Sequence, residues 1–124
     1  MLVCHFIVSD DVERSRRFYT EVLGGTVVFG PVPTYIALAN SFIIINEGGG
    51  PTDDKPTVTF EAPVDPDRVS HSMTFRVPDA RRAHEVLSAR GAQFLAPLAE
   101  SDWEIRGFFR DPDGHLLEIS EAKA

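Results

Sequence analysis

An internal repeat is the feature of this 124-residue sequence that most constrains its fold. The segment Val8-Ser9-Asp10 aligns with Val77-Pro78-Asp79 at an offset of 69 residues (79 − 10). Around each segment the order is the same: a predicted strand, an amphipathic helix, a glycine that ends the helix, and a short strand. A predicted hairpin closes each copy. Self-similarity on this scale indicates two tandem β-α-β-β-β modules.

The length of the chain suits a single domain, residues 1–124, that contains both modules. We expect the first module to span about residues 1–50 and the second about residues 71–124. The intervening segment, about residues 51–70, is rich in proline, glycine and aspartate, which predicts a linker.

The closing hairpin of the second module places a carboxylate in the middle of a predicted strand. The hairpin turns at Asp111-Pro112-Asp113-Gly114, where proline sets the first corner and glycine can take a positive φ. We expect Asp111 and Asp113 to accept hydrogen bonds from turn amides. On the return strand, Glu118 points away from Leu117 and Ile119. Because a buried carboxylate needs a partner, a metal or a proton, Glu118 is the leading site candidate. A solvent-facing glutamate on an edge strand is the alternative.

Alternation along the first strand of each copy predicts which side chains face the helix of that module. The predicted helix-facing set is apolar: Cys4, Phe6, Val8, Met73, Phe75 and Val77. The set expected to face away from the helix is mixed: Val3, His5, Ile7, Ser72, Thr74 and Arg76. Helix N-caps are expected at Ser9 or Asp10 in the first copy and at Asp79 in the second. Polar groups on the uncovered face favour an α+β fold in which a curved mixed sheet surrounds a cavity, with the helices outside.

Composition excludes several classes of function. The net charge of −7 does not suit a nucleic-acid-binding protein, because such a protein presents a basic face to phosphates. No apolar run is long enough to span a bilayer, and no secretion signal is visible. Cys4 is the only cysteine, which excludes an internal disulfide. We therefore expect a cytoplasmic protein with neither nucleic acid nor membrane as a partner.

These features resemble the vicinal oxygen chelate superfamily, which contains glyoxalase I, bleomycin-resistance proteins, fosfomycin-resistance enzymes and extradiol dioxygenases. The resemblance rests on the paired β-α-β-β-β halves and on the Val-x-Asp segment before each helix. It also rests on Phe18-Tyr19 before Leu23-Gly24 and on the motif from Arg110 to Ile119. It covers essentially the whole chain, is specific for the superfamily rather than for one activity, and implies a homodimer.

The resemblance places the four metal-ligand positions of metal-using members at Val3, Ile44 or Ile45, Ser72 and Glu118. Valine and isoleucine have no lone pair to donate, and a neutral serine hydroxyl is a poor ligand. We therefore expect no metal and no other cofactor. A divalent metal at a shifted site made by His5 and Glu118 is the alternative.

Two hypotheses for function follow from the resemblance. The first is a metal-free small-molecule-binding protein, similar to bleomycin-resistance proteins, that sequesters a drug or a metabolite. The second is an enzyme of the glyoxalase I, dioxygenase or isomerase type, metal-assisted or metal-free, with Glu118 as general base together with His5. Whether any reaction is catalysed stays open, and a weaker reading is an interaction domain whose own side chains fill the cavity.

The candidate ligand-binding residues lie on the strands expected to face the cavity. Trp103 and Phe108 could stack on a flat or cationic ligand. Arg76 and Arg110 could meet a ligand anion or pair with Glu118. The full predicted set is His5, Ile7, Ser72, Thr74, Arg76, Trp103, Phe108, Arg110 and Glu118.

Overall fold

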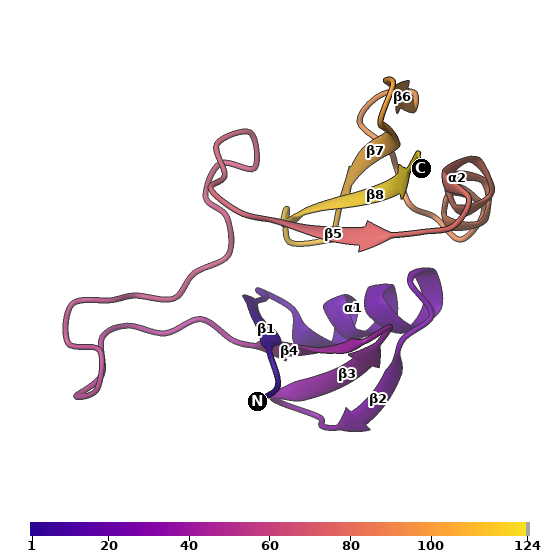
Figure 1. Ribbon diagram of the computed structural model, residues 1–124. Helices are drawn as coiled ribbons and strands as arrows, with labels where there is room; N and C mark the ends of the chain where they lie inside the picture. Colours follow the sequence, from indigo (N-terminus) through magenta and orange to yellow (C-terminus); the bar gives the residue numbers. More distant parts are fainter. Residues whose placement is uncertain (124) are drawn as a thin grey trace. The chain divides into compact units, whose positions relative to one another are not determined.

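The computed structural model describes residues 1–123, which form two compact units. The first unit is Met1–Val64, and the second begins at Asp65. Each unit contains a four-stranded mixed sheet with helical structure on one face (Figure 1). The prediction of an α+β fold built from two β-α-β-β-β modules is therefore confirmed.

The first unit orders its strands β1-β4-β3-β2, with β1 parallel to β4 and the other pairs antiparallel. Its strands are β1 (Cys4–Val8), β2 (Thr26–Phe29), β3 (Thr34–Leu38) and β4 (Ser41–Asn46). Between β1 and β2 lies helix α1 (Val12–Arg17), which continues as the π-helical segment η1 (Phe18–Val22). The core forms between this helical segment and one sheet face, where Tyr19, Ile36 and Ile45 are fully buried.

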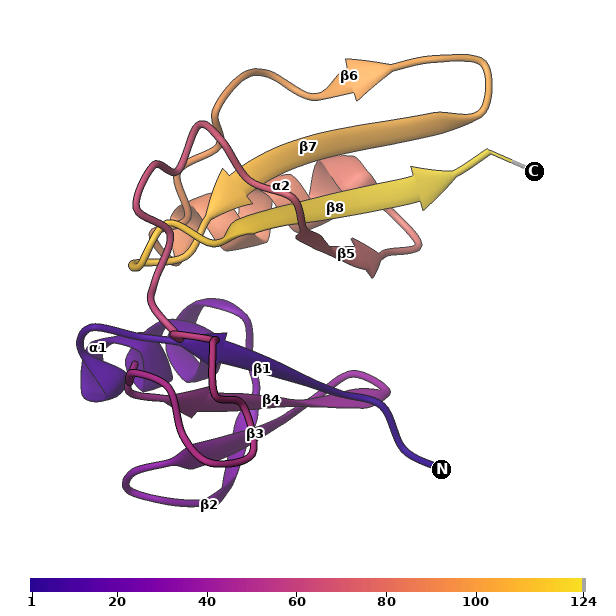
Figure 2. The same cartoon turned by 90° about the vertical axis from the view of Figure 1, so that its left-hand side faces the viewer.

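The second unit repeats the pattern, with strand order β5-β8-β7-β6 and β5 parallel to β8. Its elements are β5 (Ser72–Arg76), α2 (Ala80–Ala89), β6 (Ala99–Glu100), β7 (Glu104–Arg110) and β8 (Leu116–Ala122). Figure 2 shows α2 behind β7 and β8, on one side of the sheet only. The buried face beneath α2 carries Met73, Ile105, Phe109, Leu117 and Ile119.

The first strand and the helix of the two modules match at an offset of 68 residues, one less than the sequence alignment indicated. The N-caps are Asp11 and Asp79 (79 − 11), whose carboxylates accept hydrogen bonds from the amides of Arg14 and Arg82, both at 3.0 Å. The strands agree, since β1 begins at Cys4 and β5 at Ser72 (72 − 4). The prediction that Ser9 or Asp10 caps the first helix is therefore wrong.

This one-residue difference reverses the predicted faces of β1, because successive strand residues point to opposite sides. His5 lies opposite Ile43 and Ile7 opposite Ile45, both buried residues of the helix-covered face. His5 and Ile7 thus face the helix, contrary to the prediction, while Phe6 lies on the other face. In the second module the prediction is correct, because Met73 is buried on the helix side and Thr74 is exposed on the other.

Two segments outside the named strands form isolated bridges, and for both the sequence pattern predicts a short strand. The segment 57–62 contributes one bridge, Gly49 to Phe60, and the segment 93–96 contributes one, Phe94 to Phe109. In the first case Lys55 holds the surrounding loop closed, because its Nζ donates to the carbonyls of Gly50 (2.8 Å) and Val58 (3.1 Å). No helix among residues 1–123 is long and apolar enough to cross a membrane.

Candidate functional site

The candidate site is the open face of the second sheet, which we define as the face opposite α2. Strand registers align its side chains in three rows across β5, β8 and β7. The rows are Ser72–Leu116–Arg110, Thr74–Glu118–Phe108 and Arg76–Ser120–Arg106. Five of the predicted ligand-binding residues therefore share this face with Glu118: Ser72, Thr74, Arg76, Phe108 and Arg110.

Glu118 is the central group of this face. Its side chain is half-buried, and no hydrogen bond or ion pair from any of residues 1–123 reaches its carboxylate. Burial, and then the nearby charge of Glu104, raise the pKa of Glu118 above its ordinary value of 4.5, while Arg106 and Arg76 oppose the shift. The carboxylate is therefore placed where a ligand cation or a proton would stabilise it.

Arg106 and Glu104 form an ion pair beside Glu118. Arg106 Nη1 lies 3.2 Å from one oxygen of Glu104, and the guanidinium carbon lies 5.6 Å from the centroid of the Phe108 ring. The second oxygen of Glu104 accepts a hydrogen bond of 2.9 Å from the buried hydroxyl of Ser120. These contacts fix the position of the Arg106 side chain on the open face. The sequence analysis did not name this residue.

Arg110 pairs with Asp67 and not with Glu118. Its Nη2 lies 2.6 Å from the Asp67 carboxylate and 3.5 Å from the carbonyl of Pro66. The suggested Arg110–Glu118 pair is therefore wrong. In the turn that follows β7, the prediction for Asp111 is confirmed. Its carboxylate accepts hydrogen bonds from the backbone amides of Asp113 and His115, each 2.9 Å long.

A bulge in the outer segment creates a pocket along β7. The amide of Leu95 donates to the carbonyl of Phe108 (2.9 Å), and Ala99 pairs with Arg106, so residues 96–98 lie opposite Gly107 alone. A side chain at position 107 would require its neighbours to shift, because an added Cβ would lie 2.6 Å from Leu98 Cδ2 and 3.1 Å from Phe94 Cδ2. The pocket has a volume of about 330 Å³, and its apolar lining is Leu95, Ala96, Pro97, Ala99, Phe108 and Leu116.

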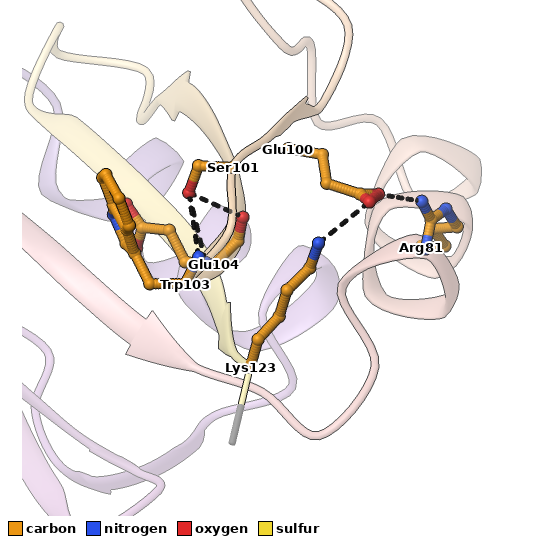
Figure 3. Close-up of polar contacts among 6 residues, drawn as sticks. All are labelled: Arg81, Glu100, Ser101, Trp103, Glu104 and Lys123. Carbon is orange, nitrogen blue, oxygen red and sulfur yellow. Dashed lines mark hydrogen bonds and ion pairs between the residues drawn. The ribbon is translucent and has the colours of Figure 1, made fainter.

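Ion pairs fix the outer edge of this pocket at β6. Glu100 accepts hydrogen bonds from Arg81 on α2 and from Lys123 after β8, the latter at 3.0 Å (Figure 3). The hydrogen bond from Lys123, and then that from Arg81, lower the pKa of Glu100. In the adjoining turn the Ser101 hydroxyl accepts hydrogen bonds from the backbone amides of Trp103 and Glu104 (Figure 3). Trp103 precedes β7 and is 70% exposed, and it lines a smaller hollow together with Glu104 and Arg106.

The open face of the first sheet, opposite its helical segment, carries an aromatic row that the sequence analysis missed. The ring centroids of Phe6 and Phe60 lie 5.0 Å apart, and those of Phe29 and Tyr35 lie 5.3 Å apart. Ile44 lies between Phe6 and Tyr35 in the register. The correct face of β1 would have revealed this row, because it brings Phe6 to the side where Tyr35 lies.

The residues present do not fit a metal ion. By the strand registers, the first-half ligand position that corresponds to Ser72 is Cys4 and not Val3, and the position that corresponds to Glu118 is Ile44. Isoleucine cannot donate and a neutral serine hydroxyl donates poorly, so only Cys4 and Glu118 among the four positions carry a group that binds metals well. No group of three His, Cys, Asp or Glu residues able to hold a metal occurs within residues 1–123. His5, the partner suggested for a shifted site, lies on the helix-covered face of its sheet.

Comparison with known proteins agrees with this fold. The sequence profile described as the Glyoxalase/Bleomycin resistance protein/Dioxygenase superfamily matches residues 3–119. TnmS3, described as an antibiotic binding protein from Streptomyces sp. CB03234, is 18% identical, with a TM-score of 0.71 and coverage of 99% of this chain and 96% of that chain. The fosfomycin resistance protein FosX from Mesorhizobium loti is also 18% identical, with a TM-score of 0.70 and coverage of 99% and 92%.

A third structure, a glyoxalase/bleomycin resistance protein/dioxygenase from Nocardioides, is 22% identical, with a TM-score of 0.75 and coverage of 98% of this chain and 83% of that chain. No curated protein matches the chain. The three structures share the fold at identities too low to transfer an activity. The profile match spans both modules, and each module has the expected strand order. The chain therefore belongs to the glyoxalase/bleomycin resistance protein/dioxygenase superfamily.

Proposed function

We propose that this protein binds a small molecule on the open face of the second sheet and sequesters it without chemical change. The observation that carries the proposal is Glu118, a half-buried carboxylate without a hydrogen-bond partner among residues 1–123. Thr74 lies beside it on β5 and Phe108 beside it on β7, so a hydroxyl and an aromatic ring flank the carboxylate. Such a group gains most from a ligand that supplies the missing partner.

The ligand-contacting residues in this proposal are Thr74, Arg76, Arg106, Phe108 and Glu118. The antibiotic-binding description of TnmS3, a protein of the same fold, supports a drug or a related metabolite as the ligand class. Binding needs no divalent metal in this proposal. His5 and Ile7 stay sequence predictions and are not part of the proposed surface, because both face the helix of the first unit.

The proposal also includes a homodimer, which family resemblance implies, and a cytoplasmic location, which suits the free and exposed Cys4. Sedimentation velocity at micromolar concentration tests the dimer. A single species at the mass of one 13.7 kDa chain would contradict it.

The raised pKa of Glu118 favours a second candidate, an enzyme that uses this carboxylate as a general base. A carboxylate with a raised pKa accepts a proton more readily, which is what a general base requires. His5 has no place in this version of the enzyme hypothesis, because it faces the helix of the first unit.

A thermal-shift screen of antibiotics and small metabolites tests both candidates, because a ligand that binds the native state raises the melting temperature. Each compound that stabilises the protein is then measured by calorimetry with the parent protein, with Glu118→Gln, and with Glu85→Gln on the exposed side of α2 as the matched control. We expect affinity to fall in Glu118→Gln alone. Mass spectrometry of the recovered compound separates the candidates: an unchanged compound supports sequestration, and turnover lost in Glu118→Gln supports the enzyme.

Metal content is measured on protein purified without chelator or histidine tag. Near-stoichiometric metal that disappears in Glu118→Ala would overturn the metal-free proposal. A protein without metal that still binds the screened compound would support it.

A further inference from the structure

The pocket along β7 adjoins Glu118 through a single side chain. Phe108 is the cross-strand neighbour of Glu118 on one side, and it lines the pocket on the other. Leu95, on the far wall, hydrogen-bonds to the backbone of Phe108. Neighbouring strands lie about 4.8 Å apart, so the row from Glu118 through Phe108 to the pocket wall spans about 10 Å. An apolar hollow and an unsatisfied carboxylate therefore lie within reach of one small molecule.

The charges around this row favour a cation. Glu118 has no ion-pair partner in the described chain, whereas Arg106 is paired with Glu104 at 3.2 Å. Arg76 lies on β5, on the side of β8 away from the pocket. The net charge of −7 also attracts cations at long range. The Phe108 ring is the cross-strand neighbour of Glu118, so a protonated amine at Glu118 would also lie close to an aromatic side chain.

The pocket itself suits an uncharged apolar group. Apart from Arg106, its lining is formed by aliphatic and aromatic side chains and by the backbone at Gly107. Its volume of about 330 Å³ lies at the lower end of the range for ligand pockets, which is enough for a ring system rather than for a large drug. The guanidinium of Arg106 also lines the pocket, whereas Glu118 has no cationic partner among the described residues, so an ammonium group is better placed at Glu118 than inside the pocket.

We propose that the ligand of this protein is a small amphiphilic amine, whose apolar ring enters the pocket formed by the 96–98 bulge and whose ammonium group pairs with Glu118. The inference rests on the proposed binding function and specifies the chemical class of the ligand. A separation of about 5–10 Å between ring and nitrogen matches one to two strand spacings.

Three probes with the same ring and chain length test the class: 4-phenylbutylamine, 4-phenylbutan-1-ol and 4-phenylbutyrate. Binding is followed by amide chemical-shift titration of the full chain. We expect the amine to bind most tightly, with shifts concentrated at Leu95, Phe108 and Glu118. The alcohol and the carboxylate should bind at least tenfold more weakly, since a hydroxyl donates only a neutral hydrogen bond to the Glu118 carboxylate and a carboxylate donates none.

Variants separate the two ends of the proposed site. Ala99→Trp fills the pocket from β6, and Ala96→Phe fills it independently from the bulge, in case the first variant disturbs the edge strand. Ala89→Trp, at the exposed end of α2, is the matched control. We expect both pocket variants and Glu118→Gln to weaken amine binding at least tenfold, and the control to leave the Kd unchanged.

Several results would overturn the inference. Binding of the carboxylate as tight as that of the amine would show that the site selects anions. Amine binding unchanged in both pocket variants would show that the ring lies elsewhere. If no probe binds while a compound from the wider screen binds and depends on Glu118, the amphiphilic-amine inference fails and the proposed binding function stands. If that compound is also insensitive to Glu118→Gln, the proposed function fails as well.

Discussion

Replacing Ile7 by alanine tests the face assignment of β1, on which the structure and the sequence pattern disagree. Ile7 is 6% exposed and lies opposite the fully buried Ile45, beneath the helical segment of the first unit. The substitution removes three buried carbons, each worth about 0.8 kcal/mol, which is about 2.4 kcal/mol. A partly relaxed cavity raises the expected cost to about 3 kcal/mol. At this chain length we expect a fall in melting temperature of roughly 10 °C.

Val3 provides the surface control, because it precedes β1 and its side chain is exposed. Val3 is 68% exposed, so Val3→Ala should cost less than about 0.5 kcal/mol. Urea unfolding followed by far-UV circular dichroism measures both values, with an unchanged m-value as the sign that compactness is preserved. Equal costs for the two variants, or a cost below about 1 kcal/mol for Ile7→Ala, would refute the face assignment.

Three further predictions concern the second unit and the helix caps. Glu118→Gln should melt at a higher temperature than the parent protein at pH 7, because the fold raises the pKa of Glu118 and so disfavours its ionised form. This gain should shrink as the pH falls through the raised pKa and vanish below the ordinary value of 4.5, where the parent carboxyl is protonated too. Alanine at either N-cap, Asp11 or Asp79, should cost about 1 kcal/mol in urea unfolding, whereas serine or asparagine should preserve the cap. Gly107→Ala should cost about 1–3 kcal/mol in the same assay, because its Cβ would lie 2.6 Å from Leu98 Cδ2.

Each of these predictions has a result that contradicts it. A melting difference for Glu118→Gln that stays constant from pH 4 to pH 8 would show that the carboxylate is not desolvated. An Asp11→Ala variant as stable as the parent would contradict the cap assignment and the 68-residue offset with it. A fully stable Gly107→Ala variant would show that the bulge can move aside.

The sequence was sufficient for the order of the elements and for the open face of the second unit. Thr74, Arg76 and Glu118 alternate with Met73, Leu117 and Ile119, so polar and apolar sides were distinct there. The same reasoning failed for β1. Phe6 and Ile7 are adjacent and both large and apolar, so the alternation of polar and apolar residues does not show which of them faces the helix. The repeat could not correct the error, because Ser9, Asp10 and Asp11 are all good caps and occupy adjacent positions.

The pocket was beyond sequence reasoning for a different reason. It exists because three residues, 96–98, lie opposite Gly107 between two backbone pairings, and such a bulge depends on the register of two strands. Arg106 was missed as a consequence. Alternation along β7 predicts that Arg106 lies near Phe108 and Glu104. The sequence does not show that a pocket lies beside Arg106.

The correspondence between the two modules has an evolutionary consequence. Several equivalent positions on the helix-covered faces are aliphatic or aromatic in both halves, as at Ile7 and Phe75 or at Ile45 and Ile119. On the opposite faces the equivalents have diverged in character, with Phe6 matched by Thr74 and Ile44 by Glu118. Duplication thus supplied one scaffold twice, and substitutions on a single face could give the copies different chemistry without disturbing the interior that either copy needs to fold.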